Sequence, residues 1–209
     1  MMKLFYLVIL LLLPVSVFSG SLHAAAQRGD IQELKILLDT GMDINLKSEK
    51  YGRTALHIAS YNKDTELIYF LLKSGADANI RMNNGRTAMH TSSFYGDRES
   101  LMMLLHYGAK INLRGKDGYT PLHRASEGGR IITVLRLLTR GAKINARSYD
   151  GTTPLHISAS MGHSKVTEIL IEKGADIYLF TQEGYTALQE AYDEDELITV
   201  KILNRVAMR

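Results

Sequence analysis

The 209-residue chain is 45% hydrophobic and carries 25 Lys and Arg against 22 Asp and Glu, a net charge of +3. This balance is typical of a folded chain, and the small, dispersed positive excess argues against a nucleic-acid partner. Because the chain has no cysteine, disulfides, thiolate nucleophiles, cysteine-ligated metals and the acylated cysteine of a bacterial lipoprotein are all excluded.

The N-terminus has the pattern of an export signal. Lysine at position 3 precedes an apolar run over residues 4–13, and the small residues that follow place Val17 and Ser19 at the −3 and −1 positions of a cleavage site. We therefore expect a signal peptide over residues 1–19, a mature chain that begins near Gly20, and a periplasmic or secreted protein.

The alternative is a membrane anchor formed by residues 4–18. As a helix this stretch would span about 22 Å, which is short of a hydrocarbon core of about 30 Å. Cleavage is therefore favoured, and the membrane is expected to be a partner only transiently, through the signal peptide.

The rest of the sequence is periodic. A glycine recurs every 33 residues, at Gly52, Gly85, Gly118, Gly151 and Gly184, and each is soon followed by Thr-Ala/Pro-Leu/Met-His, with glutamine ending the last copy. An earlier copy without the opening glycine begins near Ser21. Six copies therefore fill the domain over residues 20–209, approximately at 20–48, 51–81, 84–114, 117–147, 150–180 and 183–209.

Each copy predicts two short helices joined by a tight turn. The threonine is a good N-cap, and Pro121 or Pro154 follows it at the first helical position. The second helix carries apolar residues at helical spacing and ends at a second periodic glycine, such as Gly108 or Gly141. A pair this short cannot bury its own apolar stripe, so we predict an all-α solenoid of six stacked repeats with one continuous core.

The phrases Gly-Tyr-Thr-Pro-Leu-His-Arg-Ala at 118–125 and Gly-Ala-Lys-Ile-Asn at 108–112 and 141–145 closely resemble the ankyrin repeat. The resemblance covers roughly residues 20–209. It implies helix pairs stacked in register, hairpin-like loops that project at a right angle, and a concave inner face that binds proteins. Lys63 and Asp195 depart from the pattern, since each replaces the glycine that ends the first helix.

Five histidines recur in register, at His23, His57, His90, His123 and His156. An enzyme or metal site built on this row is an alternative, but a catalytic residue is needed once, in one constellation. In ankyrin repeats the threonine–histidine pair resembles a hydrogen-bonded brace. We therefore expect no catalytic site, no metal, no cofactor and no small-molecule substrate.

The positions that differ between copies carry the predicted function. In ankyrin repeats the residues beside the loop glycine and at the end of the first helix point towards the inner face, and here they include six of the eleven tyrosines. Tyrosine is enriched in binding interfaces. The candidate protein-binding residues are Tyr51, Arg53, Tyr61, Arg86, Phe94, Tyr95, Tyr119, Tyr149 and Tyr185. We expect Phe94 and Tyr95 to lie near the centre, with Tyr61 and Tyr119 beside them.

Overall fold

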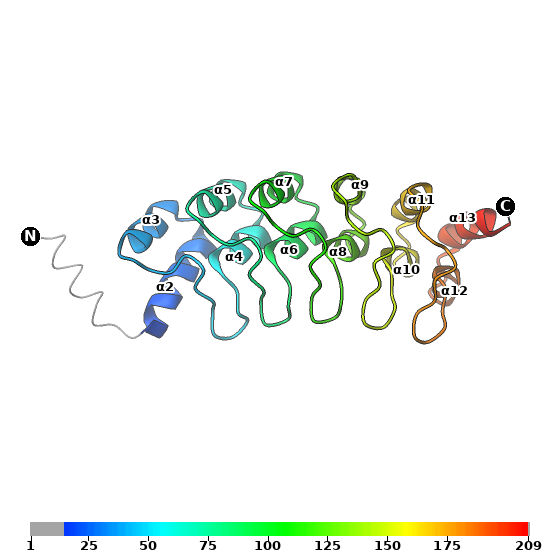
Figure 1. Ribbon diagram of the computed structural model, residues 1–209, viewed down its shortest axis with the longest axis horizontal. Helices are drawn as coiled ribbons and strands as arrows, with labels where there is room; N and C mark the ends of the chain where they lie inside the picture. The colour runs from blue at the N-terminus through cyan, green and yellow to red at the C-terminus, as the bar shows by residue number, and fades with distance from the viewer. Residues whose placement is uncertain (1–14, 209) are drawn as a thin grey trace, which may run out of the picture.

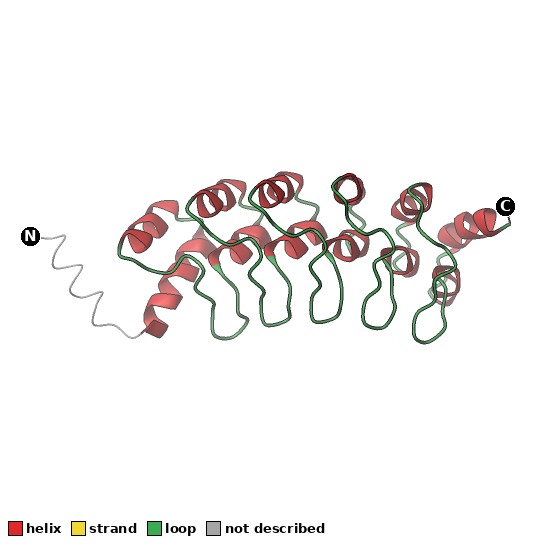
Figure 2. Cartoon of the chain, viewed as in Figure 1, coloured by secondary structure: helices red, strands yellow, loops and turns green. Residues whose placement is uncertain are grey.

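The computed structural model describes residues 15–208, which form twelve helices and no strand (Figure 2). Two rows of helices run along the molecule (Figure 1). The inner row consists of α2 (Val15–Arg28), α4 (Ala55–Asn62), α6 (Ala88–Tyr95), α8 (Pro121–Glu127), α10 (Pro154–Ser160) and α12 (Ala187–Asp193). The outer row consists of α3 (Ile31–Asp39), α5 (Thr65–Lys73), α7 (Arg98–His106), α9 (Ile131–Thr139), α11 (Ser164–Glu172) and α13 (Leu197–Ala207).

Each inner helix contacts the next inner helix and the outer helix of its own repeat. The predicted all-α solenoid of helix pairs is therefore confirmed. The first helix begins at Val15, earlier than the expected Ser21. Most of the predicted signal peptide, residues 1–14, lies outside the described residues, and among those described no helix is long and apolar enough to cross a membrane.

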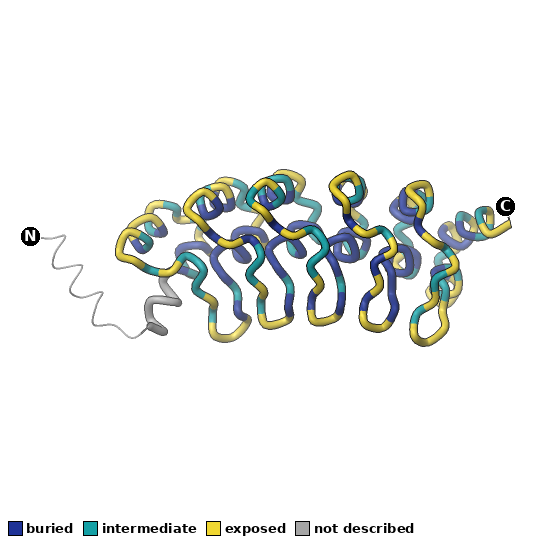
Figure 3. The backbone as a smooth tube through the Cα atoms, viewed as in Figure 1, coloured by how far each residue is buried: buried dark blue, intermediate teal, exposed yellow. Residues whose placement is uncertain are grey.

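The core lies between the two rows of helices (Figure 3). Residues at matching positions of successive repeats are buried together and pack in one cluster. The inner helices contribute Leu22, Leu56, Met89, Leu122 and Leu155, and the outer helices contribute Leu37, Leu71, Leu104, Leu137, Leu170 and Leu203. Burial of these rows against the neighbouring repeat supplies the driving force that a single helix pair lacks.

The recurring histidine ties each repeat to the next. In α6 the Nδ1 atom of His90 accepts the backbone N–H of Thr87 at 3.1 Å, and the Thr87 hydroxyl lies 2.9 Å from the same atom. Because Nδ1 is an acceptor, the ring proton is on Nε2, which donates to the Tyr119 carbonyl of the following repeat at 3.0 Å. The same bonds recur at His57, His123 and His156. The brace implied by the resemblance is therefore present.

The loops between repeats project from one side of the inner row (Figure 1). Each closes on itself like a hairpin, as where the Met82 N–H donates to the Arg86 carbonyl at 2.8 Å. Adjacent loops are also bonded to each other, since the Lys116 N–H donates to the Asn84 carbonyl at 2.9 Å. This bonding keeps successive loops in register with one another.

Two turns lack the glycine that the other repeats use. Lys63, after α4, has a φ of 57°, and Asp195, after α12, has a φ of 58°. Gly96 occupies the matching turn after α6 with a φ of 73°. Lys63 and Asp195 therefore adopt the same left-handed backbone conformation as the glycines they replace. For a residue with a Cβ atom this conformation costs roughly 1 kcal/mol.

Candidate protein-binding surface

The inner face is the surface formed by the inner helices together with the projecting loops. Five of the nine predicted residues line one cavity of about 230 Å³ on this face: Arg53, Tyr61, Arg86, Phe94 and Tyr95. They come from the second and third repeats, and Arg124 and Glu127 of the fourth repeat complete the wall. Stacking in register thus brings together residues as far apart in the chain as Arg53 and Glu127.

The aromatic cluster of Tyr61, Phe94 and Tyr95 forms one side of this cavity. The ring centroids of Tyr61 and Tyr95 are 5.4 Å apart and those of Phe94 and Tyr95 are 5.2 Å apart, both edge to face. Cations flank the rings, with the Arg53 guanidinium 5.8 Å from the Tyr61 centroid and the Lys63 ammonium 5.5 Å from that of Tyr95. The predicted centre at Phe94 and Tyr95 is therefore a packed aromatic group between positive charges.

The basic cluster of Arg86 and Arg124 forms the other side. Arg124, only 3% exposed, donates from Nη1 to Glu127 at 2.7 Å and also pairs with Asp117. Arg86 pairs with Asp117 at 3.8 Å, which is longer than a hydrogen bond. Burial, together with the charge of Arg124, lowers the pKa of Arg86. The Nε atoms of both arginines are buried without a hydrogen-bond partner among the described residues.

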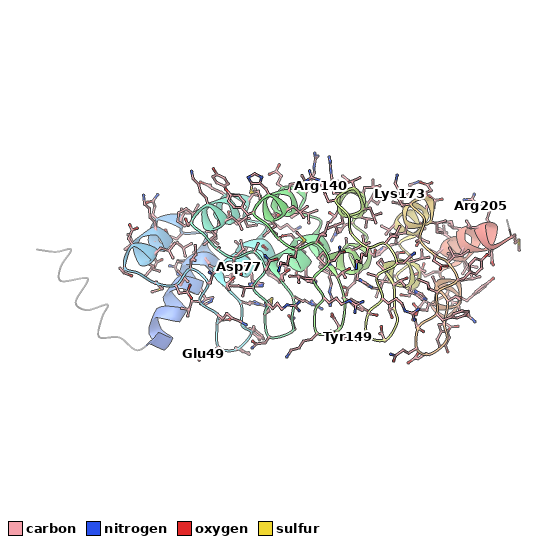
Figure 4. All side chains as sticks on the ribbon, in the orientation of Figure 1. Glu49, Asp77, Arg140, Tyr149, Lys173 and Arg205 are labelled. Atoms are coloured by element: carbon pink, nitrogen blue, oxygen red, sulfur yellow. The ribbon has the colours of Figure 1, made fainter. Side chains whose placement is uncertain are left out.

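The other four predicted residues lie outside this cavity. Tyr119 is half-buried, because its ring stacks on His123 at 5.1 Å and lies 4.6 Å from the Arg124 guanidinium. The ring centroid of Tyr51 lies 4.9 Å from the Lys50 ammonium and 4.9 Å from the Arg53 guanidinium. Tyr149 is 60% exposed on a projecting loop (Figure 4). Tyr185 lies further along the stack, in the sixth repeat.

Acidic residues surround Tyr185. A second cavity, of about 340 Å³, is lined by Tyr185 with Glu183, Glu190, Asp193 and Glu194. Burial and the nearby carboxylates of Asp150 and Glu183 raise the pKa of Glu190 to about 7. The inner face is therefore basic over the second to fourth repeats and acidic at its C-terminal end.

Arg124 and Glu190 were not among the predicted site residues. Each directly follows the recurring histidine or its glutamine counterpart, a position that holds Ile58, Thr91 and Ile157 in other repeats. A charge at an otherwise uncharged position of an inner helix was the available signal. Comparison of the copies position by position, and not only at the loops, would have found both residues.

The recurring histidines use their ring nitrogens for hydrogen bonds within and between repeats. Burial lowers the pKa of His57, His90 and His123 to about 4. These rings are therefore neutral at pH 7, and both of their nitrogens are hydrogen-bonded. Within the described range, no three His, Asp or Glu side chains are placed to hold a metal ion.

Comparisons with known proteins agree on the family. Models of ankyrin repeats match residues 22–72, 59–148 and 133–205. The human ankyrin repeat domain-containing protein 40 is 41% identical over 64 residues, which are 31% of this chain and 17% of that protein. The Drosophila melanogaster NF-kappa-B inhibitor cactus is 43% identical over 58 residues, which are 28% of this chain and 12% of that protein. The mouse 2-5A-dependent ribonuclease is 36% identical over 66 residues, 32% of this chain and 9% of that enzyme.

This chain therefore spans less than a fifth of each of these relatives. Ankyrin repeats generally bind proteins and are generally not enzymatic, although the ribonuclease carries them as part of an enzyme. The family matches cover most of the chain and coincide with the helix pairs and the histidine braces. The chain belongs to the ankyrin-repeat family.

Proposed function

We propose that this chain is a non-enzymatic module that recognises a partner protein through its inner face, centred on the cavity between the second and fourth repeats. The observation that carries the proposal is the convergence of Arg53, Tyr61, Arg86, Phe94 and Tyr95 on that cavity. None of these five residues belongs to the leucine rows of the core.

The chemistry of the cavity favours a protein over a small molecule. Its volume of about 230 Å³ is below the range of roughly 300–1,000 Å³ that is usual for small-molecule sites. Tyrosine and arginine supply five of the twelve residues that line it, and these residue types dominate the energetic centres of protein interfaces. The similarity to the NF-kappa-B inhibitor cactus, which is named for its action on another protein, also supports a protein partner.

Capture of the partner from the source cells tests this proposal. The mature chain is immobilised beside the variants Tyr61→Ala and Tyr69→Ala. Tyr61 is 54% exposed on the inner face, whereas Tyr69 is 45% exposed on the outer helix α5 and serves as the matched control. Loss of a central aromatic residue typically costs about 2 kcal/mol or more of binding, roughly thirtyfold in affinity.

We expect a partner that the parent and Tyr69→Ala retain and that Tyr61→Ala loses, with all three chains melting at nearly the same temperature. A partner lost with Tyr69→Ala but kept by Tyr61→Ala would move the binding site to the outer helices and overturn the proposal. Tyr119 is unsuitable for this test, because its ring packs on His123 and Arg124.

We further propose that the module is exported, to the periplasm or outside the cell, because residues 1–19 have the pattern of a cleaved signal. The competing model is a membrane-tethered scaffold held by residues 4–18. Fractionation of the source cells separates the two, since the tethered form would sediment with membranes and would be released only by detergent.

A further inference from the structure

We infer that the cavity between the second and fourth repeats accepts an acidic side chain, Asp or Glu, of the partner protein, with Arg86 as its main counter-charge. This inference rests on the proposed function and names the chemistry of the partner.

Positive charges outnumber negative charges around the cavity. Three guanidinium groups, of Arg53, Arg86 and Arg124, line it. Two carboxylates, those of Asp117 and Glu127, lie nearby, and both pair with Arg124. With the Lys63 ammonium beside the Tyr95 ring, the surroundings of the cavity therefore carry an excess of positive charge, and Arg53 has no carboxylate partner within the described part of the chain.

Two of the arginines at the cavity also have unused hydrogen-bonding capacity. The Nε atom of Arg124 is buried without a partner in the described residues, and so is that of Arg86. An unsatisfied donor on a buried cation is costly, and a carboxylate can satisfy a guanidinium through two parallel hydrogen bonds. Both Nε atoms are closed to solvent, so the carboxylate would bind the outer N–H groups of Arg86, whose side chain is 40% exposed and is held by Asp117 only at 3.8 Å.

The cavity suits a single carboxylate better than a phosphate group. Glu127 also lines the cavity, and its charge would repel a phosphate dianion about twice as strongly as a single carboxylate. The aromatic cluster of Tyr61, Phe94 and Tyr95 offers an apolar wall for the methylene stem of an Asp or Glu side chain.

A small probe tests the site without the partner. The α-amide of N-acetyl-glutamate is titrated into the isotope-labelled mature chain while guanidinium and backbone resonances are followed by NMR. We expect saturable shifts at Arg86 and Arg124, with binding weakened at least about fivefold when the probe is the neutral glutamine analogue. Arg86→Met should weaken glutamate binding to the same extent, and Arg86→Lys should weaken it less.

Arg140→Met is the matched control, because Arg140 is exposed beside the outer helix α9 (Figure 4). It should bind the probe like the parent, and circular dichroism should show that every variant is folded. Equal shifts with the glutamate and glutamine probes, or no shift at all, would overturn the inference. Stronger shifts with inorganic phosphate at equal concentration would also overturn it, in favour of a phosphorylated partner.

These outcomes are separate from those of the capture experiment. If Tyr61→Ala loses the partner while the glutamate probe causes no shift, the proposed function stands and this inference fails. If the probe binds at Arg86 but Tyr61→Ala still captures the partner, the cavity is an anion site and the proposed binding surface fails.

Discussion

At the residue scale, the histidine braces make the stability of the protein depend on pH. Burial lowers the pKa of His57, His90 and His123 to about 4, and it also lowers that of His156. In the unfolded chain a histidine titrates near 6.5. Between these values the unfolded state binds more protons than the folded state, so stability is complete above about pH 6.5 and is lost as the pH falls towards 4.

We predict that His90→Gln weakens this pH dependence. In the last repeat Gln189 already takes the histidine position, and its Oε1 accepts the Thr186 N–H at 2.8 Å, so glutamine fits the turn without titrating. Between pH 6.5 and 5 a single braced histidine accounts for about 2 kcal/mol of lost stability. Urea unfolding at both pH values should show that the free energy of unfolding falls by that much less in the variant than in the parent. An identical fall in the two chains would show that His90 does not contribute to the pH dependence.

At the element scale, the turn between α4 and α5 contains an avoidable strain. Lys63 adopts the left-handed conformation there, which glycine adopts without steric cost. We predict that Lys63→Gly raises the free energy of unfolding by about 0.5–1 kcal/mol, as measured by chemical denaturation. Gly96→Ala, at the matching turn after α6, should lower it, because the added Cβ would lie 2.7 Å from Arg130 Cδ. The interpretation fails if Lys63→Gly destabilises the chain.

The outer helices hold the stack together through their leucine row. Leu104 in α7 is fully buried and belongs to the single core cluster. We predict that Leu104→Ala costs about 2–5 kcal/mol, through lost burial and the cavity left behind. Thermal unfolding checks this value, and Met103→Ala in the same helix, where the side chain is only partly buried, should cost clearly less.

At the scale of the whole molecule, each repeat is stabilised by its neighbours, so the position of the N-terminus matters. Helix α2 runs across the predicted cleavage point, and Leu22, Ala25 and Ala26, which lie after Gly20, are buried in the core. We predict that a chain beginning at Gly20 melts like the longer chain, whereas one beginning at Gln27 melts at a much lower temperature, since α4 then loses its packing partner.

N-terminal sequencing of the native protein checks the same point directly. We expect a first residue at or next to Gly20. An intact Met1 in protein purified from the source cells would support the tethered model, and equal melting of the chains starting at Gly20 and Gln27 would show that the first inner helix does not contribute to the stack.

Most of the fold was predictable from the sequence because its determinants are local and repeated. A threonine cap, a proline at the first helical position and a glycine after most of the helices act within a few residues. Their recurrence every 33 residues showed that the copies stack, and the resemblance to the ankyrin repeat implied that Phe94, Tyr95 and Tyr61 share the inner face. The conformation of Lys63 also followed from its place in the repeat.

By itself, then, the sequence determined the helix pairs, their order in the stack and the residue types on the inner face. Only the tertiary structure decided which of those residues share a cavity. Arg86 and Arg124 line the same cavity because two repeats pack in register. Tyr119 becomes a packing residue because its ring lies against His123 and Arg124. Glu190 lies near several other carboxylates, which help to raise its pKa. Such contacts join residues one or more repeats apart, and their strength depends on burial, which no local pattern specifies.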